Sequence, residues 1–293
     1  MRWFLAVLVL LGLGLRGNAA TPSAVIADPP VDKAHPAAMA YVRIPSHGAL
    51  MNGVFYTAAG AGPHPALLLL HGFPGNEQNL DLAQAVRRAG FDVLTLHYRG
   101  SWGSPGAFSF THAMEDSDAA IAFLKANAAK YHLDPHRIFA AGHSMGGFMA
   151  ASAAAHNPDV AGLIMISAWD IGRDGGQFHN KAFRQAQLDQ EFRDDAIPLA
   201  GTTPQALMDE AMDKAKGWEF ADWALNLGLR PVLLVTADDG SQTDSHRLAL
   251  ALRQNNNRAV TETHMATDHP YSDHRIALEA AVVDWLEHRR AGP

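Results

Sequence analysis

Residues Arg137–Gly147 read RIFAAGHSMGG, and this stretch decides how the rest of the chain is expected to fold. Its first part, Ile138–Ala141, is a short apolar run typical of a strand, whereas the Ala- and Met-rich residues from Met145 onward favour a helix. Between them lies a G-x-S-x-G pentapeptide, so Ser144 is predicted to stand at the tip of a sharp strand-to-helix turn. Flanking glycines permit such a turn because they carry no Cβ atom that would clash with neighbouring backbone.

The same turn predicts a nucleophile. It would expose the Ser144 hydroxyl above the sheet, while the N–H of Met145, at the start of the helix, would face a developing oxyanion. A G-x-S-x-G string alone recurs by chance, and the alternative is a glycine-rich turn with an idle serine. The preceding strand and the following small-residue helix are the context that the motif requires, and they favour the catalytic interpretation.

The composition is that of a globular protein. The chain has 293 residues, of which 48% are hydrophobic and 18% are charged, which suits one large α/β domain with a substantial core. A net charge of −7 without any basic run gives nucleic-acid binding no electrostatic basis. Because the sequence has no cysteine, disulfides, thiolate zinc sites and a cysteine nucleophile are excluded, which leaves serine for covalent chemistry.

Residues 1–19 have the plan of a secretory signal peptide. Arg2 is followed by an uncharged run, Trp3–Leu15, and then by Arg16–Ala20, which ends in small residues, with cleavage expected after Ala19. The run is shorter than the roughly 20 residues that a transmembrane helix needs, so no stable membrane insertion is expected after cleavage. We therefore expect a secreted or periplasmic protein. An uncleaved membrane anchor is the alternative.

Apolar runs that suit strands alternate with stretches that suit helices along most of the chain. Residues 20–37 are rich in Pro and Ala and are expected to form a loose leader. The strands are expected at Met39–Ile44, Leu50–Tyr56, Ala66–Leu70, Phe91–Leu96, Ile138–Ala141, Val160–Ser167, Pro231–Val235 and Ala259–Met265. The helices are expected at residues 80–89, Asp116–Lys130, residues 145–156, Lys181–Arg193, Pro204–Leu227, Thr243–Gln254 and Ile276–Arg290. This alternation predicts an open, mostly parallel sheet with helices on both faces.

Residues 170–229 break the alternation of strands and helices. They are richly charged and contain helical stretches, but they lie between two expected strands of the sheet. An insertion of this kind is expected to form a helical cap over the strand ends, where open α/β sheets bind their ligands. We therefore divide the chain after residue 37 into an α/β core, residues 38–169 and 230–293, and a cap segment, residues 170–229.

The loop His71–Asn76 directly follows the apolar run Ala66–Leu70. Its glycines permit an unusual backbone path, which would aim the N–H of Phe73 at the top of the sheet. Acyl-transfer chemistry needs two backbone N–H groups on one oxygen, and Phe73 and Met145 would supply them as an oxyanion hole. The alternative is a simple strand-to-helix loop with a buried His71, and the G-x-S-x-G motif favours the oxyanion hole.

Together these motifs resemble the α/β-hydrolase family over about residues 39–290. The chain is most similar to the serine esterase and aminopeptidase-like branches, whose H-G-F-x-G, G-H-S-M-G-G and D-H-x-F/Y segments match His71–Gly75, Gly142–Gly147 and Asp268–Tyr271. Their R-G-x-G loop is matched only loosely, because Arg99–Gly103 reads R-G-x-x-G. The resemblance implies an α/β-hydrolase fold and a triad whose members follow the chain order Ser, acid, His.

The same resemblance implies that His269 is the catalytic base, because His269 fills the D-H-x-F/Y position in the loop after the last strand. Two further histidines lie nearby in the sequence. His264 falls inside the expected last strand, and His274 falls at the start of the closing helix. Neither of them occupies the position that the family's motif assigns to the base.

The acid of the triad is expected in the turn after Pro231–Val235, where Asp238, Asp239 and Asp244 are available. The family places it about five residues past the last apolar strand position, which here is Gly240, a departure by one. Asp239 lies nearest and forms a favoured turn pair with Gly240, so Asp239 is preferred ahead of Asp238. Asp244 is expected to cap the next helix or to lie in its first turn.

The sequence therefore predicts a serine hydrolase with a Ser144, Asp239 and His269 triad that acts on a small-molecule ester or a small amide. A non-catalytic interaction protein on the same scaffold is the alternative function. Neither a metal nor another cofactor is expected, since H-E-x-x-H is absent and Pro135 interrupts the helical spacing of His132 and His136.

Overall fold

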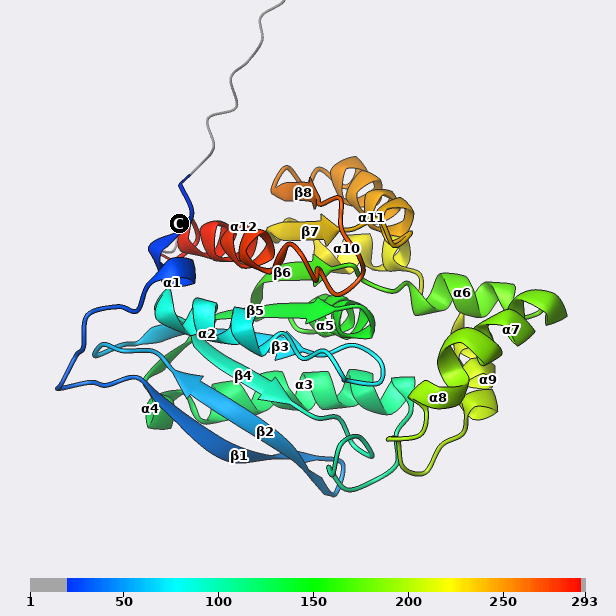
Figure 1. The fold of residues 1–293 in the computed structure, drawn as a ribbon, viewed down its shortest axis with the longest axis horizontal. Helices are drawn as coiled ribbons and strands as arrows, with labels where there is room; N and C mark the ends of the chain where they lie inside the picture. The colour runs from blue at the N-terminus through cyan, green and yellow to red at the C-terminus, as the bar shows by residue number, and fades with distance from the viewer. Residues whose placement is uncertain (1–19, 291–293) are drawn as a thin grey trace, which may run out of the picture.

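Eight strands form one sheet, in the order β1-β2-β4-β3-β5-β6-β7-β8, in the computed structural model, which describes residues 20–290 (Figure 1). The strands are β1 Ala38–Ser46, β2 Ala49–Thr57, β3 His64–Leu70, β4 Asp92–Leu96, β5 Leu133–His143, β6 Val160–Ile166, β7 Val232–Thr236 and β8 Val260–His264. The β1–β2 hairpin and the β2–β4 pair are antiparallel, and every pair from β4 through β8 is parallel. The predicted mostly parallel sheet is confirmed.

The burial of the strands explains their composition. Every residue of β3, β4 and β7 is buried, as expected for parallel strands that are covered on both faces. In β1, by contrast, Val42 and Ile44 are buried while Tyr41 and Arg43 are exposed, because one face of this edge strand packs on the core and the other meets solvent. The parallel centre of the sheet is therefore its most enclosed part.

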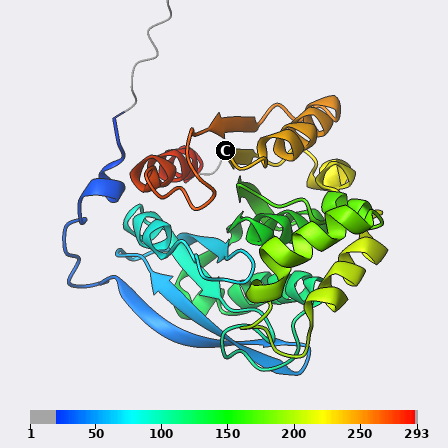
Figure 2. The same cartoon turned by 45° about the vertical axis from the view of Figure 1, so that its right-hand side comes forward.

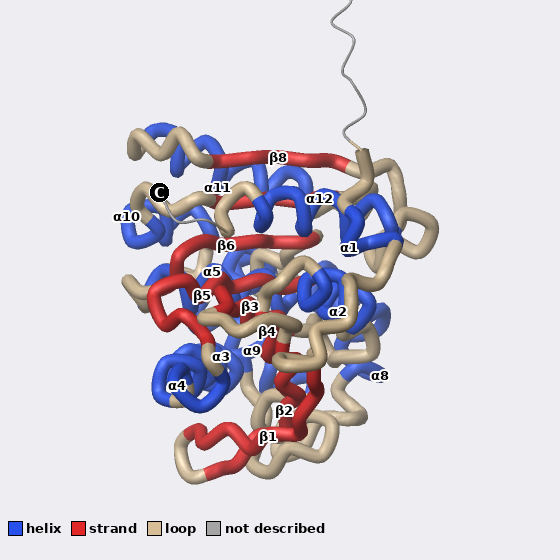
Figure 3. Tube along the Cα trace, turned by 90° about the vertical axis from the view of Figure 1, so that its left-hand side faces the viewer, coloured by secondary structure: helices blue, strands red, loops and turns tan. Residues whose placement is uncertain are grey.

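Helices cover both faces of the sheet, as Figure 3 shows from its edge. One face carries α1 Ser23–Ile26, α2 Leu80–Arg88 and α12 Arg275–Glu287, whose apolar side chains form one buried cluster with the sheet. The other face carries α3 Phe110–Ala126, α5 Met145–His156 and α11 Gln242–Gln254, which form the larger cluster. The short α4 Ala128–Tyr131 follows α3. The predicted helices on both faces are confirmed.

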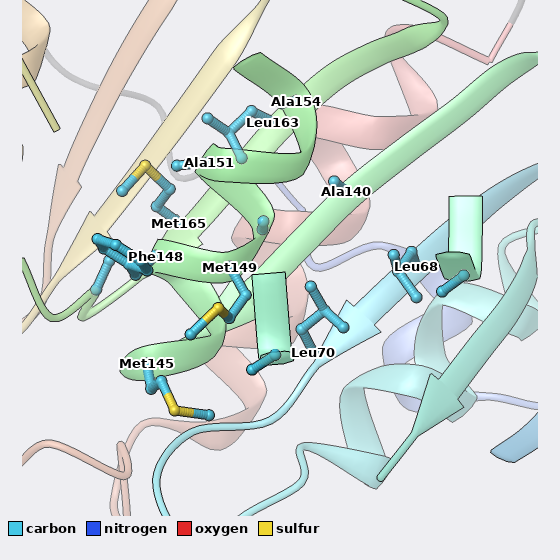
Figure 4. Packing of buried hydrophobic residues seen from close by; sticks show 14 of the residues in the cluster. Leu68, Leu70, Ala140, Met145, Phe148, Met149, Ala151, Ala154, Leu163 and Met165 are labelled. Carbon is cyan, nitrogen blue, oxygen red and sulfur yellow. The ribbon is translucent and has the colours of Figure 1, made fainter. Parts of the chain in front are cut away.

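Helix α5 packs on the centre of the sheet (Figure 4). Met145, Phe148 and Met149 of this helix are fully buried in one cluster with Leu70 of β3 and Met165 of β6. Fully burying a side chain of this size contributes about 1.5–3 kcal/mol to stability. The helix that begins directly after Ser144 is therefore held by some of the most enclosed packing in the molecule.

The cap segment is built from short helices. Those up to Lys214 lie beyond one end of the sheet, the end towards which the β7 arrow points in Figure 1, and the last two elements pack against α5 and α11. The elements of the segment are α6 Ile171–Gln177, α7 Lys181–Gln187, the π-helical turn η1 Leu188–Phe192, α8 Arg193–Asp195, α9 Pro204–Lys214, the 3-10 turn η2 Phe220–Trp223 and α10 Ala224–Leu227. Figure 2 brings α6 to α9 forward. Their position next to the carboxyl ends of the strands is where ligands of open α/β sheets bind.

Hydrogen bonds join the cap segment to the core. The N–H of Ala200 donates to the Gly100 carbonyl at 2.7 Å, and the Ala200 carbonyl accepts from the Phe108 N–H at 2.9 Å. The Glu210 carboxylate accepts the N–H groups of Phe110 and Thr111, both at 2.8 Å. Because these two residues begin α3, the carboxylate also stabilises the positive end of that helix dipole.

Two of the expected helices have wrong bounds. The helix expected from Asp116 begins at Phe110, because the Ser109 side chain caps it by accepting the His112 N–H at 3.0 Å. The single helix expected over Pro204–Leu227 is two helices, since Gly217 has a positive φ of +94° between them. The helical stretch expected at Lys181–Arg193 is confirmed, since α7, the π-helical turn η1 and α8 follow one another without a gap from Lys181 to Asp195. Helix α6 was not expected.

Part of the stretch expected to be a loose leader, residues 20–37, packs against the core. Ala24 of α1 is buried beside α2 and α12, and its carbonyl accepts a hydrogen bond from the Arg88 guanidinium at 2.6 Å. The predicted signal peptide, residues 1–19, lies outside the described residues. Among residues 20–290, no helix has the length and apolar character needed to cross a membrane.

Candidate active site

Ser144 stands between β5 and α5 with backbone angles of φ +55° and ψ −124°. A non-glycine residue at positive φ is strained, so the conformation persists only where the surrounding structure enforces it. Here the Ser144 N–H donates to the Ile166 carbonyl at 2.9 Å, and its carbonyl accepts from the N–H groups of Gly147 and Trp169, both at 3.0 Å. Bonds to β6, to α5 and to the segment after β6 therefore fix the turn.

The glycines of the motif are required by the close approach of α5 to the sheet. A Cβ atom on Gly142 would lie 2.0 Å from the Gly146 carbonyl oxygen, and one on Gly146 would lie 2.1 Å from the Leu70 carbonyl oxygen. Both distances are far inside van der Waals contact. The helix can begin directly above β3 and β5 only because these side chains are absent, and this places Ser144 at the carboxyl edge of the sheet.

Ser144 lines a pocket with a volume of about 530 Å³. The pocket is lined by residues from the strand ends and from the cap segment: Phe73, Ser144, Ser167, Ala168, Trp169, Asp170, Asp174, Gln187, Asp195, Asp239, Gly240, Ser241, Asp244 and His269. Four of the five residues proposed for the site from the sequence, Ser144, Asp239, His269 and Phe73, thus meet in one cavity. The fifth, Met145, follows Ser144 directly as the first residue of α5.

His269 lies in the loop between β8 and α12, and its Nδ1 is 2.7 Å from a carboxylate oxygen, Oδ2, of Asp239. The other oxygen, Oδ1, accepts from the N–H and the hydroxyl of Ser241, at 3.0 and 2.6 Å. Burial opposes the charge of Asp239, yet the hydrogen bonds from His269 and Ser241 prevail and hold the pKa of this carboxyl well below its usual range. Asp239 is therefore a carboxylate at any neutral pH, and it fixes the proton of His269 on Nδ1.

The other candidates for the acid and the base lie elsewhere. An Asp238 oxygen is 3.1 Å from Nε2 of His264, and this pair is at the surface beside β8. His274 precedes the first residue of α12. Asp244 lies in the first turn of α11, where its carboxylate is 3.0 Å from the Arg173 guanidinium. Among the three carboxylates considered from the sequence, Asp239 is the one that contacts His269.

The loop that carries Phe73 passes directly beside Ser144, since a Cβ atom on Gly72 would lie 3.0 Å from the Ser144 Cβ. In the described part of the chain, the Phe73 N–H donates to no other group. Met145 begins α5, so its N–H has no partner within the helix. Both N–H groups are therefore free of the hydrogen bonds that would compete with a substrate oxygen.

Two buried histidines flank the site. His71 lies within 2.8 Å of the Gly72 carbonyl through Nδ1, and His143 lies within 2.9 Å of the His269 carbonyl through Nε2. Burial lowers the pKa of each to about 4, so both are neutral imidazoles that donate to these carbonyls. His71 belongs to the H-G-F-x-G segment and His143 to the G-H-S-M-G-G segment, but nothing in the sequence indicated that His143 contacts His269.

Four carboxylates line the pocket although the sequence did not place them there: Asp170, Asp174, Asp195 and Asp244. Burial raises the pKa of all four, and that of Asp170 reaches about 7. Asp170 accepts the N–H groups of Arg173 and Phe220, and Asp174 accepts the Trp169 indole N–H at 2.7 Å. The place of Asp170 soon after β6 is a usable signal, since strand ends line such pockets. Asp195, inside a cap helix, has none.

Within residues 20–290, no group of three or more His, Asp or Glu side chains is arranged to hold a metal ion. Three of the wall carboxylates have protein partners instead: Asp170 accepts backbone N–H groups, Asp174 accepts an indole N–H, and Asp244 pairs with a guanidinium.

The sequence is similar to one curated protein, the dihydrolipoyllysine-residue acetyltransferase component of the acetoin cleaving system of Pseudomonas putida. The two are 31% identical over 205 residues, which is 67% of this chain and 51% of that protein. The chain thus spans about half the length of this relative, and the likeness concerns only that part of it.

The fold is similar to those of solved hydrolases. The carboxyl esterase of Bacillus coagulans superposes with a TM-score of 0.67 and 17% identity over 86% of this chain and 98% of that one. An esterase of Pyrobaculum calidifontis gives a TM-score of 0.65 and 17% identity over 87% of both chains. The acylaminoacyl peptidase of Pyrococcus horikoshii gives 0.65 and 17% over 88% of this chain and 42% of that one. At these identities the likeness concerns the fold.

The family is shown by the sequence itself. A family model described as the alpha/beta hydrolase fold matches residues 65–256, about two thirds of the chain, from β3 through α11. The matched part contains the strained turn at Ser144 and the turn at Asp239. With its eight-stranded sheet and its serine at the strand-to-helix turn, the chain belongs to the α/β-hydrolase fold family.

Proposed function

We propose that this protein is a serine hydrolase that cleaves a carboxylic ester or a small amide bond through an acyl-enzyme on Ser144. The observation that carries the proposal is the 2.7 Å hydrogen bond between Asp239 and His269 in the pocket that Ser144 lines. An oriented histidine beside a strained, pocket-lining serine is the arrangement that activates a hydroxyl as a nucleophile. The fold similarity to esterases and to an acylaminoacyl peptidase supports the same chemistry.

In the proposed mechanism, Nε2 of His269 takes the Ser144 proton as the Ser144 oxygen attacks the acyl carbonyl carbon. Nε2 is available for this role because Nδ1 is bonded to Asp239. The N–H groups of Phe73 and Met145 stabilise the negative oxygen of the tetrahedral intermediate. His269 then gives the proton to the leaving group. In the second half of the reaction, His269 takes a proton from water as the water oxygen attacks the acyl-enzyme, and it returns a proton to the Ser144 oxygen as the acid product leaves.

The pocket limits which substrates fit the proposal. A volume of about 530 Å³ suits a small molecule, and Phe73 and Trp169 give part of the wall an aromatic surface. The carboxylates of the wall disfavour substrates that carry a negative charge near the scissile bond. The cap segment supplies Asp174 and Gln187 to this wall, so we assign substrate selection to the cap segment.

A substrate panel tests the function. Purified protein without residues 1–19 is assayed with p-nitrophenyl esters of increasing chain length, with aminoacyl p-nitroanilides, and with a p-nitrophenyl hemisuccinate matched in length to a neutral ester. We expect turnover of a short neutral ester, less with the hemisuccinate, and a loss of several powers of ten in Ser144→Ala. Near-normal turnover by a folded Ser144→Ala variant would end the serine-hydrolase proposal. No turnover of any substrate by the wild type would favour the non-catalytic interaction protein.

We also propose that the protein acts outside the cytoplasm, after removal of residues 1–19. The proposal is supported by the uncharged run behind Arg2 and the small residues before Ala20. Sequencing of the mature N-terminus from the native cell is expected to begin at Ala20 or Thr21, in the secreted or periplasmic fraction. Retention of Trp3 in a membrane fraction would instead support the anchor.

A further inference from the structure

His143 connects the nucleophile turn to the loop of the candidate base. It is the last residue of β5, directly before Ser144, and only 3% of it is exposed. Its Nε2 is 2.9 Å from the main-chain carbonyl oxygen of His269, and the two imidazole rings lie 4.5 Å apart, centre to centre. Residues 126 positions apart are thus joined by one hydrogen bond and one ring contact.

The partner of this bond fixes the tautomer of His143. A carbonyl oxygen only accepts, so Nε2 must carry the proton and donate it. Nδ1 then carries a lone pair, and it is buried without a hydrogen-bond partner among residues 20–290. Adding a proton there would bury a charge and an unpaired donor, which is costly. The charged and titratable groups around the ring are His269, Arg275 and Asp239. His269 and Arg275 oppose a positive charge on His143, whereas Asp239 favours it.

We propose that His143 is a positioning residue, which holds the main chain of His269 at a fixed distance from Ser144 through its Nε2–H donor. The inference rests on the proposed function, because the distance matters only if His269 takes the Ser144 proton. It assigns no contact between His143 and the substrate.

The need for such a bond follows from how His269 is otherwise held. Its ring is 44% exposed, and within the described residues 20–290 its side chain has one hydrogen bond, to Asp239. That bond controls how the ring turns, but Asp239 follows β7 and is not attached to the nucleophile turn. The bond from His143 begins one residue from Ser144, so it ties the base loop to the nucleophile with a single peptide unit between them. A misplacement of about 1 Å in such a site costs about 10²-fold in rate.

Two substitutions at position 143 separate the hydrogen bond from packing. His143→Gln keeps an N–H donor at about the reach of imidazole Nε2, whereas His143→Met fills a similar length without a donor. His64 supplies a matched control, since it is also a buried histidine whose Nε2 contacts a carbonyl, that of Gly60 at 3.1 Å, at the opposite end of β3 from the site. Any loss caused merely by removing a buried histidine should appear equally in His64→Met.

The measurements are kcat and KM for the best p-nitrophenyl ester, together with the thermal midpoint of each variant. We expect His143→Met to lower kcat about 10²-fold with KM within about threefold. His143→Gln should recover at least about tenfold of that loss. His64→Met should lower stability without lowering kcat of the folded protein. A folded His143→Met with kcat within threefold of wild type, or equal losses in the Met and Gln variants, would overturn the proposal.

A second readout does not depend on turnover. Histidine side-chain ¹H–¹⁵N spectra of the wild type should show His143 as a neutral Nε2–H tautomer between pH 5.5 and 8, and His143→Met should shift the main-chain signals of residues 268–271. An Nδ1–H tautomer, or unshifted signals, would refute the positioning role. If the wild type hydrolyses no ester, the proposed function fails, and these spectra still decide whether the bond holds the His269 loop.

Discussion

Replacing Asp239 by Asn tests how the candidate base is oriented. In the native site, Oδ1 of Asp239 accepts two hydrogen bonds from Ser241, while Oδ2 accepts the Nδ1–H of His269. The amide group of Asn has only one accepting oxygen. Because Ser241 presents two donors, the Asn oxygen is expected to stay at the Oδ1 position, which turns the NH₂ group towards His269.

The expected magnitude follows from the proton on the imidazole. An NH₂ group facing Nδ1 forces Nδ1 to accept, so the proton of the neutral ring moves to Nε2. Nε2 then cannot take the Ser144 proton, and the charged imidazole also loses its carboxylate partner. A wrong tautomer of this kind costs about 10²–10⁴ in kcat, or roughly 3–5 kcal/mol of transition-state stabilisation.

The assay is steady-state hydrolysis of a p-nitrophenyl ester at pH 8, with the thermal midpoint measured for every variant. Asp238→Asn is the matched control, since Asp238 is adjacent in sequence but contacts the surface residue His264. Asp238→Asn and Asp244→Asn should each stay within about tenfold of wild type. A folded Asp239→Asn variant that also stays within tenfold would refute the reasoning.

Two further predictions concern stability. Gly146→Ala should destabilise the protein by about 3 kcal/mol or prevent folding, because the new Cβ would lie 2.1 Å from a backbone oxygen of Leu70; Gly176→Ala, in helix α6 with its nearest neighbour 4.0 Å away, should instead be neutral or stabilising in urea unfolding. Burial raises the pKa of Asp92 from 3.8 to about 6, so the folded protein holds a proton that the unfolded chain releases, and stability is lost as pH rises through about 6. Asp92→Asn should remove this loss, so the free energy of unfolding of the variant relative to that of the wild type should rise by about 2 kcal/mol between pH 4.5 and pH 8. The same difference in unfolding free energy between the two proteins at both pH values would contradict the prediction.

The features that were predictable from the sequence are those encoded within a few neighbouring residues. The strain at Ser144 and the close approach of α5 to the sheet both follow from Gly142–Gly147, so six consecutive residues were enough to predict them. The buried strands were equally readable, because β3 and β7 are short runs of aliphatic residues between turn signals.

Most of the features that were missed depend on contacts between distant segments. The start of α3 has a local signal, the Ser109 cap, which was overlooked, and it is also stabilised by Glu210, which lies 100 residues from Phe110 in the chain. Asp195 of the cap segment lines the same pocket as Ser144, which lies about 50 residues earlier in the chain. The bond of His143 to His269 spans 126 positions, and no local pattern of residues indicates which carbonyl a buried histidine will meet.

The most direct test of the central claim, that Ser144 is an activated nucleophile, is covalent labelling by a fluorophosphonate probe followed by mass spectrometry of the digested protein. The account predicts one equivalent of adduct, located on the peptide that contains Ser144, absent in Ser144→Ala and formed at least about 10²-fold more slowly in Asp239→Asn. A folded wild-type protein that gains no adduct, or that gains it on a residue other than Ser144, would contradict the account.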